Sequence, residues 1–372
     1  MKIGFEAKRV FHNKTGLGNY SRDLIDNMSH FFPENQYYLY NPKKSFKSKF
    51  EVNNSNVFEK LPKSNFYRKF KNFWRQIGIV NDLVQDQIEI FHGLSGEIPI
   101  GLKSRNIRSV VTIHDLIFEK YPELYSFWDR KIHYYKFKKA AMKADVIVAV
   151  SEQTKNDIIE ILKIQPEKIK VIYQGCHAVF KEKINDLECQ FILKKYKIPQ
   201  NYILNVGTIE TRKNVLLAIK AITNIDITLV IVGKKTNYFV EIEEYINSNN
   251  LQQKIIFLNG LELKELAILY RCAKLFVYPS IYEGFGIPII EALYSKTPVI
   301  TTIGGVFPEA GGHDSIYVHH ENVQEMEFQI SRLLNNHDLR NEIAEKGFEF
   351  VQKFNDDCVA KNYMMVYREL IS

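Results

Sequence analysis

Residues 279–293 read PSIYEGFGIPIIEAL, which is the most informative stretch of the chain. The apolar run 275–278 before it predicts a short buried strand. Pro288 suits the first turn of a helix, where the N–H that proline lacks would have no helical partner. The pattern therefore predicts a strand, a glycine turn and a helix start, with Glu283 in the loop and Glu291 about one turn into the helix.

The backbone around this glycine turn predicts a site for an anion. The N–H groups of Phe285, Gly286 and Ile287 should point outward from the helix start, where unpaired donors and the helix dipole favour a phosphate. The two carboxylates nearby would accept hydrogen bonds from sugar hydroxyls. A simpler alternative is a strand end with a glycine turn and two solvated glutamates.

Four other stretches occur in order along the chain, namely TGLGNY at 15–20, TIHDL at 112–116, VS at 150–151 and VGTIETRKN at 206–214. Together with the two glutamates separated by seven residues, they resemble the landmarks of the retaining glycosyltransferases of family 4. The segment HDLIFEKYPE at 114–123 is most like bacterial mannosyltransferases. The resemblance implies the GT-B fold, in which two Rossmann-like domains face each other across a deep cleft and a C-terminal helix crosses back to the N-terminal domain.

A chain of 372 residues is long enough for two domains. Short apolar runs alternate with longer segments of helical period, a pattern typical of α/β folds with parallel sheets. We expect an acceptor-binding domain at 1–180, a nucleotide-sugar-binding domain at 181–355, and a helix at 356–372 that returns to the first domain. The polar segment 175–200 is expected to be the hinge. The predicted strands lie at 2–6, 37–40, 88–91, 109–113, 146–150, 170–173, 202–206, 228–232, 254–258, 275–278 and 298–301.

The four cysteines, Cys176, Cys189, Cys272 and Cys358, form no Cys-x-x-Cys pair and no metal-binding spacing with histidine. We expect them to be small packing residues in a reduced, cytoplasmic protein. The N-terminus enters a predicted strand directly, and no apolar stretch approaches the roughly 18 residues of a membrane span, so we expect neither a leader nor a spanning helix. The expected location is cytoplasmic, at the inner face of the plasma membrane if the protein binds lipid.

Two other groups of residues follow predicted strands, where ligands of open α/β sheets bind. Gly16 and Gly18 lack Cβ atoms and would let the backbone approach a diphosphate or an acceptor, although an ordinary glycine turn has the same pattern. Arg212 and Lys213 follow the strand that ends at Val206. We expect them to bind the nucleotide diphosphate, the alternative being a solvated basic pair.

Transfer of a sugar from a nucleoside diphosphate builds negative charge on the departing phosphate, so cations and N–H donors are the main requirement. Arg212, Lys213 and the amides of 285–287 would meet it. The resemblance implies that Glu291 holds the ribose hydroxyls, that Glu283 lies against the donor sugar, and that transfer retains configuration without a nucleophilic side chain. The chain contains no Asp-x-Asp sequence, so we expect no required metal and no cofactor besides the donor substrate, GDP-mannose or a UDP-sugar.

Three further residues follow predicted strands. His114 is expected at the mouth of the cleft, and the resemblance implies that it contacts a sugar hydroxyl; a packed or solvated histidine is the alternative. His92, in FHGLSG at 91–96, has a similar placement. Ser151 is expected to cap a helix at 152–163, because no Gly-x-Ser-x-Gly context makes it a nucleophile.

The formal net charge is +7, and the segment 60–77 concentrates basic residues with no acid between them. Its large apolar residues recur at helical spacing, at positions 66, 70, 73, 74 and 77. Such a face suits an anionic bilayer, and the acceptor would then be a lipid-linked glycan. The alternative is a helix that docks these aromatics into the core while its lysines remain solvated.

Other function classes share some of these features. A nucleotide-sugar epimerase of the GT-B type has the same architecture, but the loop with Glu283 and Glu291 fits a transferase better. A dinucleotide oxidoreductase would need a third glycine after Gly16 and Gly18. A non-enzymatic protein that binds nucleic acid or membrane could use the segment 60–77, but it would leave two α/β domains unexplained, so we expect no nucleic-acid partner.

Overall fold

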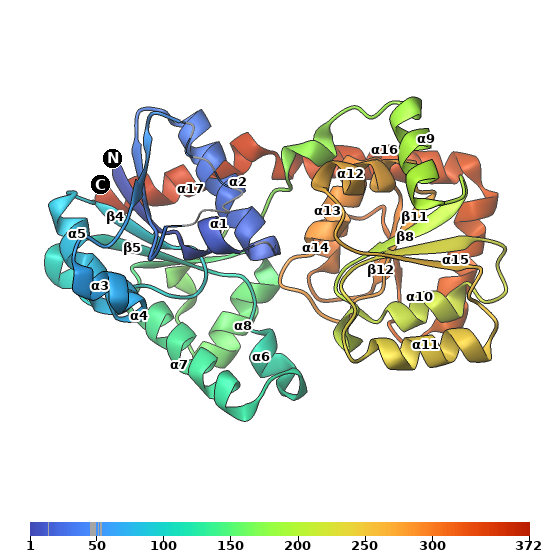
Figure 1. The fold of residues 1–372 in the computed structure, drawn as a ribbon, viewed down its shortest axis with the longest axis horizontal. Coiled ribbons are helices and arrows are strands. Elements are labelled where there is room, and N and C mark those ends of the chain that lie inside the picture. The colour runs from blue at the N-terminus through green and yellow to red at the C-terminus, as the bar shows by residue number, and fades with distance from the viewer. Residues whose placement is uncertain (14, 45–49, 51, 53) are drawn as a thin grey trace. The chain divides into compact units, whose positions relative to one another are not determined.

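The computed structural model describes residues 1–13, 15–44, 50, 52 and 54–372. The chain divides into two compact units, of which the first contains 1–175 together with 354–372 and the second contains 176–353. Each unit has a parallel sheet covered by helices (Figure 1). These divisions lie within a few residues of the boundaries expected at 180 and 355.

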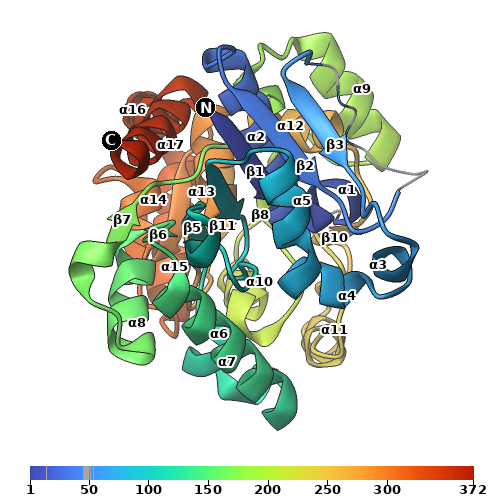
Figure 2. The same ribbon diagram turned by 90° about the vertical axis from the view of Figure 1, so that its left-hand side faces the viewer.

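Seven parallel strands form the sheet of the first unit within the described residues. Their order across the sheet is β3 (Val57–Lys60), β2 (Gln36–Tyr40), β1 (Lys2–Glu6), β4 (Ile90–Gly93), β5 (Arg108–Ile113), β6 (Val146–Ala149) and β7 (Ile169–Val171). The helices of this unit include α1 (Lys8–His12), α2 (Gly16–Phe31), α3 (Asn65–Lys69), α4 (Lys71–Phe73), α5 (Ile79–Gln85), α6 (Ile117–Lys120), α7 (Phe127–Lys143), α8 (Glu152–Leu162) and α17 (Asp356–Ile371). In Figure 2, in which this unit faces the viewer, α3 and α4 lie next to one end of α5.

The sheet of the second unit has six parallel strands in the described part of the chain. Their order is β10 (Ile255–Leu258), β9 (Thr228–Val232), β8 (Tyr202–Val206), β11 (Leu275–Tyr278), β12 (Val299–Thr302) and β13 (Ile316–Val318). The helices include α9 (Asp186–Tyr196), α10 (Val215–Ala221), α11 (Phe239–Ser248), α12 (Leu263–Cys272), α13 (Ile287–Tyr294), α14 (Phe307–Gly311), α15 (Val323–Asn335) and α16 (His337–Val351). Among all described helices, none is long and apolar enough to span a membrane.

The C-terminal helix α17 belongs to the first unit, as the resemblance implied. It packs along α2 (Figure 1) and buries Tyr363 and Tyr367 completely. Tyr363 OH lies 2.6 Å from Tyr20 OH, and Tyr367 OH lies 2.7 Å from Nδ1 of His92. Nε2 of His92 in turn lies 2.8 Å from Oγ1 of Thr112 on β5. Because these buried groups satisfy one another, they hold the helix against the sheet in one position.

The structure differs from the predicted elements in three places. β3 and β13 were not predicted, and both lie at sheet edges and are partly exposed. Two of the four residues of β3 are charged, and β13 is only three residues long, so neither gives a clear strand pattern in the sequence. α9 occupies part of the segment expected to be an irregular hinge. Its start is fixed by a capping box, in which the side chain of Asn185 accepts from the N–H of Glu188 and the Glu188 carboxylate accepts from the N–H of Asn185.

A disulfide links α9 to α12 in the second unit. Cys189 and Cys272 are joined, with their Cα atoms 6.2 Å apart. The expectation that all four cysteines are packing residues is therefore wrong for this pair. The two lie 83 residues apart, a spacing that carries no signal in the sequence. Cys176 is a buried thiol and Cys358 a partly buried one.

Candidate functional site

The turn between β11 and α13 has the predicted form. β11 is completely buried, α13 begins at Ile287 directly after Gly286, and Pro288 lies in its first turn. Gly286 has a φ of +106°, in the left-handed region that residues with a Cβ rarely adopt. The glycine lets the chain turn sharply from the strand end into the helix. Glu283 consequently lies at the C-terminal end of the sheet, and Glu291 lies one turn into the helix.

Glu283 is the centre of a charged cluster. Its Oε1 lies 2.5 Å from Nζ of Lys213 and 2.9 Å from Nη1 of Arg212. The same oxygen accepts hydrogen bonds from Oγ of Ser280 at 2.6 Å and from the hydroxyl of Tyr278 at 2.9 Å. Burial acts to raise the pKa of this carboxyl, but Lys213 and Arg212 together outweigh burial and lower the pKa to about 2. Glu283 is therefore ionised at neutral pH.

The two cations come from the loop after β8. Arg212 is only 9% exposed, and its Nη2 lies 2.6 Å from Oε1 of Glu210, while its Nη1 donates to the carbonyl of Tyr282. Two carboxylates, Glu210 and Glu283, thus match the charges of Arg212 and Lys213. The structure brings together residues from two separate motifs, VGTIETRKN and PSIYEGFG, at neighbouring strand ends. The pairing of the cations with these carboxylates was not predicted.

Glu291 has a different environment from Glu283. Its Oε2 accepts a hydrogen bond from the hydroxyl of Tyr270 on α12 at 2.9 Å. Burial raises the pKa of Glu291 to about 7, and the bond from Tyr270 offsets this only in part. At neutral pH the carboxyl is consequently present in both its protonated and its ionised form. Such a group can donate a hydrogen bond to a hydroxyl as well as accept one.

The two glycines of the first unit have different surroundings. Gly16 begins α2, and a Cβ on it would meet nothing within 4 Å. A Cβ on Gly18 would lie 2.2 Å from the carbonyl oxygen of Asn13. Gly18 is therefore required for the packing of this turn on itself, whereas the backbone at Gly16 is open to approach.

His114 follows β5 and has both ring nitrogens engaged. Nε2 lies 2.9 Å from the carbonyl oxygen of Leu94, to which it must donate, so Nδ1 accepts from Nε2 of Gln174 at 2.7 Å. The ring packs edge-on against Tyr20, with the ring centroids 4.6 Å apart. Burial lowers the pKa of His114 to about 4, so the ring is neutral at pH 7. These contacts are those of the packed alternative, and the ring would reach a ligand only by exchanging a partner.

His92 is not at an open strand end, so its expected similarity to His114 is wrong. The ring is completely buried between Thr112 and Tyr367, and burial lowers its pKa to about 3. It therefore serves the packing of α17. The prediction for Ser151 is confirmed, because its side chain accepts from the N–H of Thr154 at 3.0 Å and caps α8.

Comparisons with known proteins agree with the ordered motifs. Residues 16–178 match the family model described as Glycosyltransferase Family 4, and residues 190–350 match the model described as Glycosyl transferases group 1. The O-antigen chain mannosyltransferase RfbU of Salmonella typhimurium is 32% identical over 264 residues, which cover 68% of this chain and 69% of the relative. The chain belongs to family 4 of the glycosyltransferases.

This glycosyltransferase is also similar to the O-antigen chain mannosyltransferase B of Escherichia coli, at 25% identity over 73% of this chain and 72% of the relative. Among solved structures, Alr3699/HepE of Anabaena in complex with UDP and glucose superposes with a TM-score of 0.77 at 17% identity, over 99% of this chain and 100% of that one. This likeness shows the GT-B fold. Membership of the family makes the protein an enzyme and decides against the non-enzymatic alternatives.

Three partners in the enzyme's charged cluster were not singled out from the sequence. Tyr278 is the last residue of β11, and its hydroxyl accepts from Nζ of Lys213 at 2.6 Å while donating to Glu283. Ser280 and Glu210 stand within the quoted motifs, next to the residues that were named. A polar side chain at the last position of an apolar strand is the signal that would have identified Tyr278, because such positions face the ligand edge of a parallel sheet.

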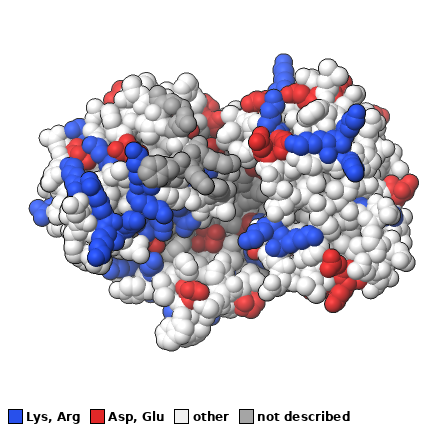
Figure 3. Space-filling view, viewed as in Figure 1, with Lys and Arg blue, Asp and Glu red and all other residues white. Residues whose placement is uncertain are grey.

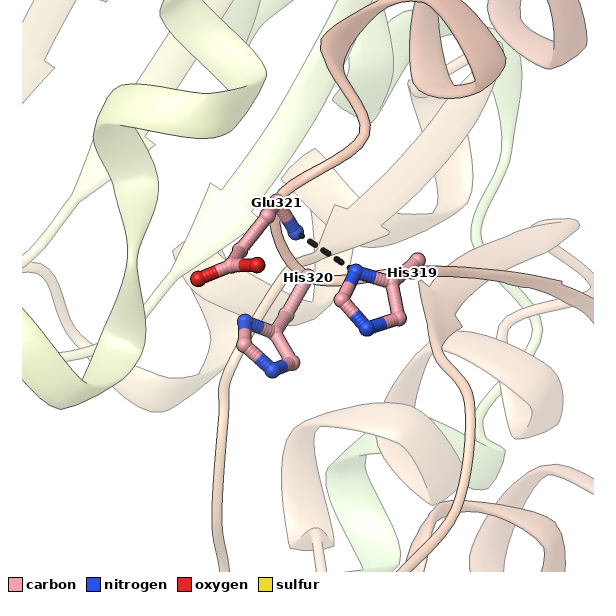
Figure 4. A group of neighbouring side chains, drawn as sticks. All are labelled: His319, His320 and Glu321. Carbon is pink, nitrogen blue, oxygen red and sulfur yellow. Dashed lines mark hydrogen bonds between the residues drawn. The ribbon is translucent and has the colours of Figure 1, made fainter.

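One group in the described part of the chain has the residue types of a metal site. His319, His320 and Glu321 follow β13, and their ligand atoms lie within 4.8 Å of one another (Figure 4). Nδ1 of His319, however, accepts from the N–H of Glu321 at 3.3 Å, and the two imidazole rings stack with centroids 4.5 Å apart. The group consists of adjacent, largely exposed residues, and we assign no metal to it. Metal-independent transfer stays a prediction.

The segment 60–77 combines features of both predicted alternatives, namely aromatic side chains docked in the core and aromatic side chains exposed for a membrane surface. Trp74 is completely buried, and its Nε1 donates to Oδ2 of Asp82 at 2.7 Å. The other large apolar side chains are between 46% and 55% exposed, and these are Phe66, Phe70, Phe73 and Ile77. In Figure 3, Lys and Arg gather over the part of the first unit where Figure 1 shows α3 and α4. Trp74 therefore anchors a segment whose remaining aromatic side chains lie among basic ones at the surface.

Proposed function

We propose that this glycosyltransferase moves mannose from GDP-mannose to a lipid-linked glycan with retention of anomeric configuration. The observation that carries the proposal is the cluster of Arg212, Lys213 and Glu283 beside the start of α13. Two relatives named as O-antigen chain mannosyltransferases support mannose as the sugar. A UDP-sugar is the alternative donor.

Arg212 and Lys213 would bind the diphosphate and stabilise the charge that develops on it as the sugar leaves. Glu283 and Glu210 hold both cations in position before the donor arrives, so little reorganisation is needed during transfer. Because the four side chains together carry no net charge, the backbone N–H groups of 285–287 would supply further stabilisation of the phosphate. Removal of one such donor typically costs about 3 kcal/mol, on the order of a hundredfold in rate.

We do not propose Glu283 as a nucleophile. Two cations and two hydroxyls contact its Oε1, and a pKa of about 2 makes the carboxylate weakly basic. Retention would instead follow a front-face route, in which the departing phosphate accepts the proton of the acceptor hydroxyl. A mass increase of one hexose on Glu283 after incubation with donor alone would contradict this route.

The other predicted residues have proposed roles of their own. Glu291 would bind the ribose hydroxyls, and the open backbone at Gly16 would approach the diphosphate or the acceptor. His114 would contact a sugar hydroxyl through Nδ1 once Gln174 releases that nitrogen. Gly18 would contribute by shaping the turn rather than by touching a ligand.

We further propose a cytoplasmic enzyme that contacts the membrane peripherally through 60–77. The exposed Phe70 and Phe73, surrounded by basic residues, would insert at an anionic surface. In sedimentation with phosphatidylglycerol vesicles, the double variant F70S/F73S should bind at least fivefold more weakly than the wild type. Phe328→Ser, which removes a 62% exposed phenylalanine from the second unit, is the matched control. Equal binding by all three proteins would remove this part of the proposal.

The transferase proposal is tested by sugar transfer with the full chain. Nucleotide sugars are first screened by thermal shift, since a donor at a hundred times its dissociation constant stabilises by about 2.7 kcal/mol. GDP-mannose should bind and support transfer in the presence of EDTA. Lys213→Ala should lower kcat on the order of a hundredfold, whereas Lys183→Ala, at an exposed position, should not change it. Transfer from a UDP-sugar only, or loss of turnover in EDTA that magnesium restores, would refute the donor or the metal assignment.

A further inference from the structure

The first unit contains a basic cavity of about 510 Å³. It opens at the C-terminal ends of β1 and β4, because its lining includes Lys8 and Arg9 after β1 and Ser95 after β4. Ligands of open parallel sheets bind at these strand ends. Its lining shares no residue with the donor cluster, whose residues all belong to the second unit.

The charges around this cavity are predominantly positive. Lys8, Arg9, Arg75 and Lys136 line it together with a single carboxylate, that of Glu97. Glu97 is shared, with its Oε2 lying 3.2 Å from Nη2 of Arg75 and its Oε1 lying 3.3 Å from Nζ of Lys136. Neither Lys8 nor Arg9 forms an ion pair within the described part of the chain. The cavity therefore retains uncompensated positive charge, as a phosphate site requires.

Arg9 and Arg75 are held in fixed orientations. Nε of Arg9 donates to Oγ of Ser95 at 2.7 Å, and Nε of Arg75 lies 2.8 Å from Oε1 of Glu6. Each guanidinium is thus positioned before any ligand binds, which lowers the entropy cost of binding.

An apolar groove of about 490 Å³ adjoins the basic cavity and shares Gln76, Glu97 and Lys136 with it. One wall is α7, on which Trp128, Ile132 and Tyr135 recur at helical spacing. These three side chains are 74%, 52% and 65% exposed, which is unusual for large apolar residues.

The groove also has a basic rim. Its lining includes four lysines, which are Lys131, Lys136, Lys139 and Lys143. Lysine stems pack along apolar surface while their ammonium groups stay in water, so such a rim suits an apolar ligand that carries negative charge at one end. The rim and the basic cavity therefore point to the same ligand chemistry.

We propose that the cavity and the groove together bind one anionic lipid, with its diphosphate between Arg9 and Arg75 and the first part of its hydrocarbon chain against Trp128 and Ile132. This inference rests on the proposed function, because it assigns the lipid diphosphate that carries the acceptor glycan to this site. Both volumes fall within the roughly 300–1,000 Å³ of small-molecule sites.

Farnesyl diphosphate, a soluble isoprenoid diphosphate, and inorganic pyrophosphate are the probes. Binding to the full chain is followed by tryptophan fluorescence, since the chain has two tryptophans and Trp128 is the exposed one. Farnesyl diphosphate should bind at least tenfold more tightly than pyrophosphate and shift the emission to shorter wavelength. Equal affinity of the two probes would overturn the proposal.

Variants separate the two parts of the site. Arg9→Gln and Lys8→Gln should each weaken the binding of both probes several-fold, whereas Lys183→Gln should leave the binding of both unchanged. Ile132→Ser should weaken the binding of farnesyl diphosphate several-fold and leave the binding of pyrophosphate unchanged. Met142→Ser, which alters another exposed apolar side chain of α7 outside the groove, is its control. Equal effects of I132S and M142S would show that the groove does not bind the hydrocarbon chain of the ligand.

Two further arms distinguish the remaining explanations. Binding to phosphatidylglycerol vesicles without binding to monomeric farnesyl diphosphate would overturn the proposal in favour of a membrane-docking face. Transfer of mannose to a water-soluble glycan is measured on the same proteins. If that transfer is intact but farnesyl diphosphate does not bind, this inference fails and the proposed function stands. If the probe binds but no acceptor is glycosylated, the proposed function fails.

Discussion

Replacement of Glu283 by glutamine tests whether this carboxylate holds the donor cluster together. The variant keeps the size of the side chain and its carbonyl oxygen, which can still accept from Ser280. It removes the negative charge that faces Arg212 and Lys213, and Arg212 is then left largely buried with Glu210 as its only carboxylate partner. Loss of one member of a buried ionic cluster is strongly destabilising, because the charges that remain are desolvated without compensation.

The pKa of Glu283 gives the magnitude of this effect. It falls from an ordinary value of 4.5 to about 2, and at about 1.36 kcal/mol per pH unit the difference corresponds to about 3 kcal/mol of folding stability at neutral pH. Because the pKa is lowered in the folded state, this stability is fully present above pH 4.5 and is lost as the pH falls towards 2. E283Q lacks this carboxyl group, so its stability cannot fall through protonation at this position.

Calorimetric melting at pH 7 and at pH 2.5 measures both quantities. E283Q should melt about 6–12 °C below the wild type at pH 7, and the difference should shrink at pH 2.5. Glu345→Gln, which breaks the exposed pair with Lys296, should cost about 1 kcal/mol or less and is the control. A melting temperature of E283Q within 2 °C of the wild type at pH 7, or a deficit that persists at pH 2.5, would refute the reasoning.

Three other perturbations have defined outcomes. His92→Phe removes the hydrogen bonds to Tyr367 and Thr112 and should destabilise the first unit by about 2 kcal/mol. Proteolysis within α17 should become faster, and an unchanged rate of cleavage would contradict this role of His92. Reduction of the disulfide, or Cys272→Ser, should destabilise the second unit by up to about 4.5 kcal/mol for a link across 83 residues, and a melting temperature insensitive to dithiothreitol would contradict this. The pKa of Glu291 is about 7, so donor affinity should rise as the pH increases through 7 and the carboxylate forms. In E291Q the donor affinity should not change over this pH range. Parallel plots of donor affinity against pH for the two proteins would exclude Glu291 as the titrating group.

The sequence predicted the strands that are buried on both faces. β1, β8, β9 and β11 were predicted at their observed bounds, because each contains a short buried run of mostly apolar residues. The edge strands β3 and β13 were missed, since charged residues end the apolar run of β3 and β13 is only three residues long. The start of α13 was predicted because glycine and proline there have steric requirements that act locally.

The long-range contacts could not be predicted in the same way. Glu283 and Arg212 each stand in a recognisable motif, but the ion pair between them depends on β8 and β11 being neighbours in the sheet. His92 has the position of a strand-end residue, and its burial depends on Tyr367, which lies 275 residues further along the chain. Local patterns carry no information on such partners. The sequence therefore identified the ligand edge of the second sheet but not the ion pairs between the charged residues there.

The return of α17 to the first unit has a consequence for biosynthesis. The second unit is an insertion between residues 175 and 354, so the first unit lacks α17 until the second unit has been synthesised. Before then, the partners of Tyr363 and Tyr367, which are Tyr20 on α2 and His92 on β4, are uncovered, although all strands of both units have been synthesised. The unit whose strands are synthesised first is therefore completed only after the second unit, and its sheet must stay free of aggregation without α17 while the inserted unit folds.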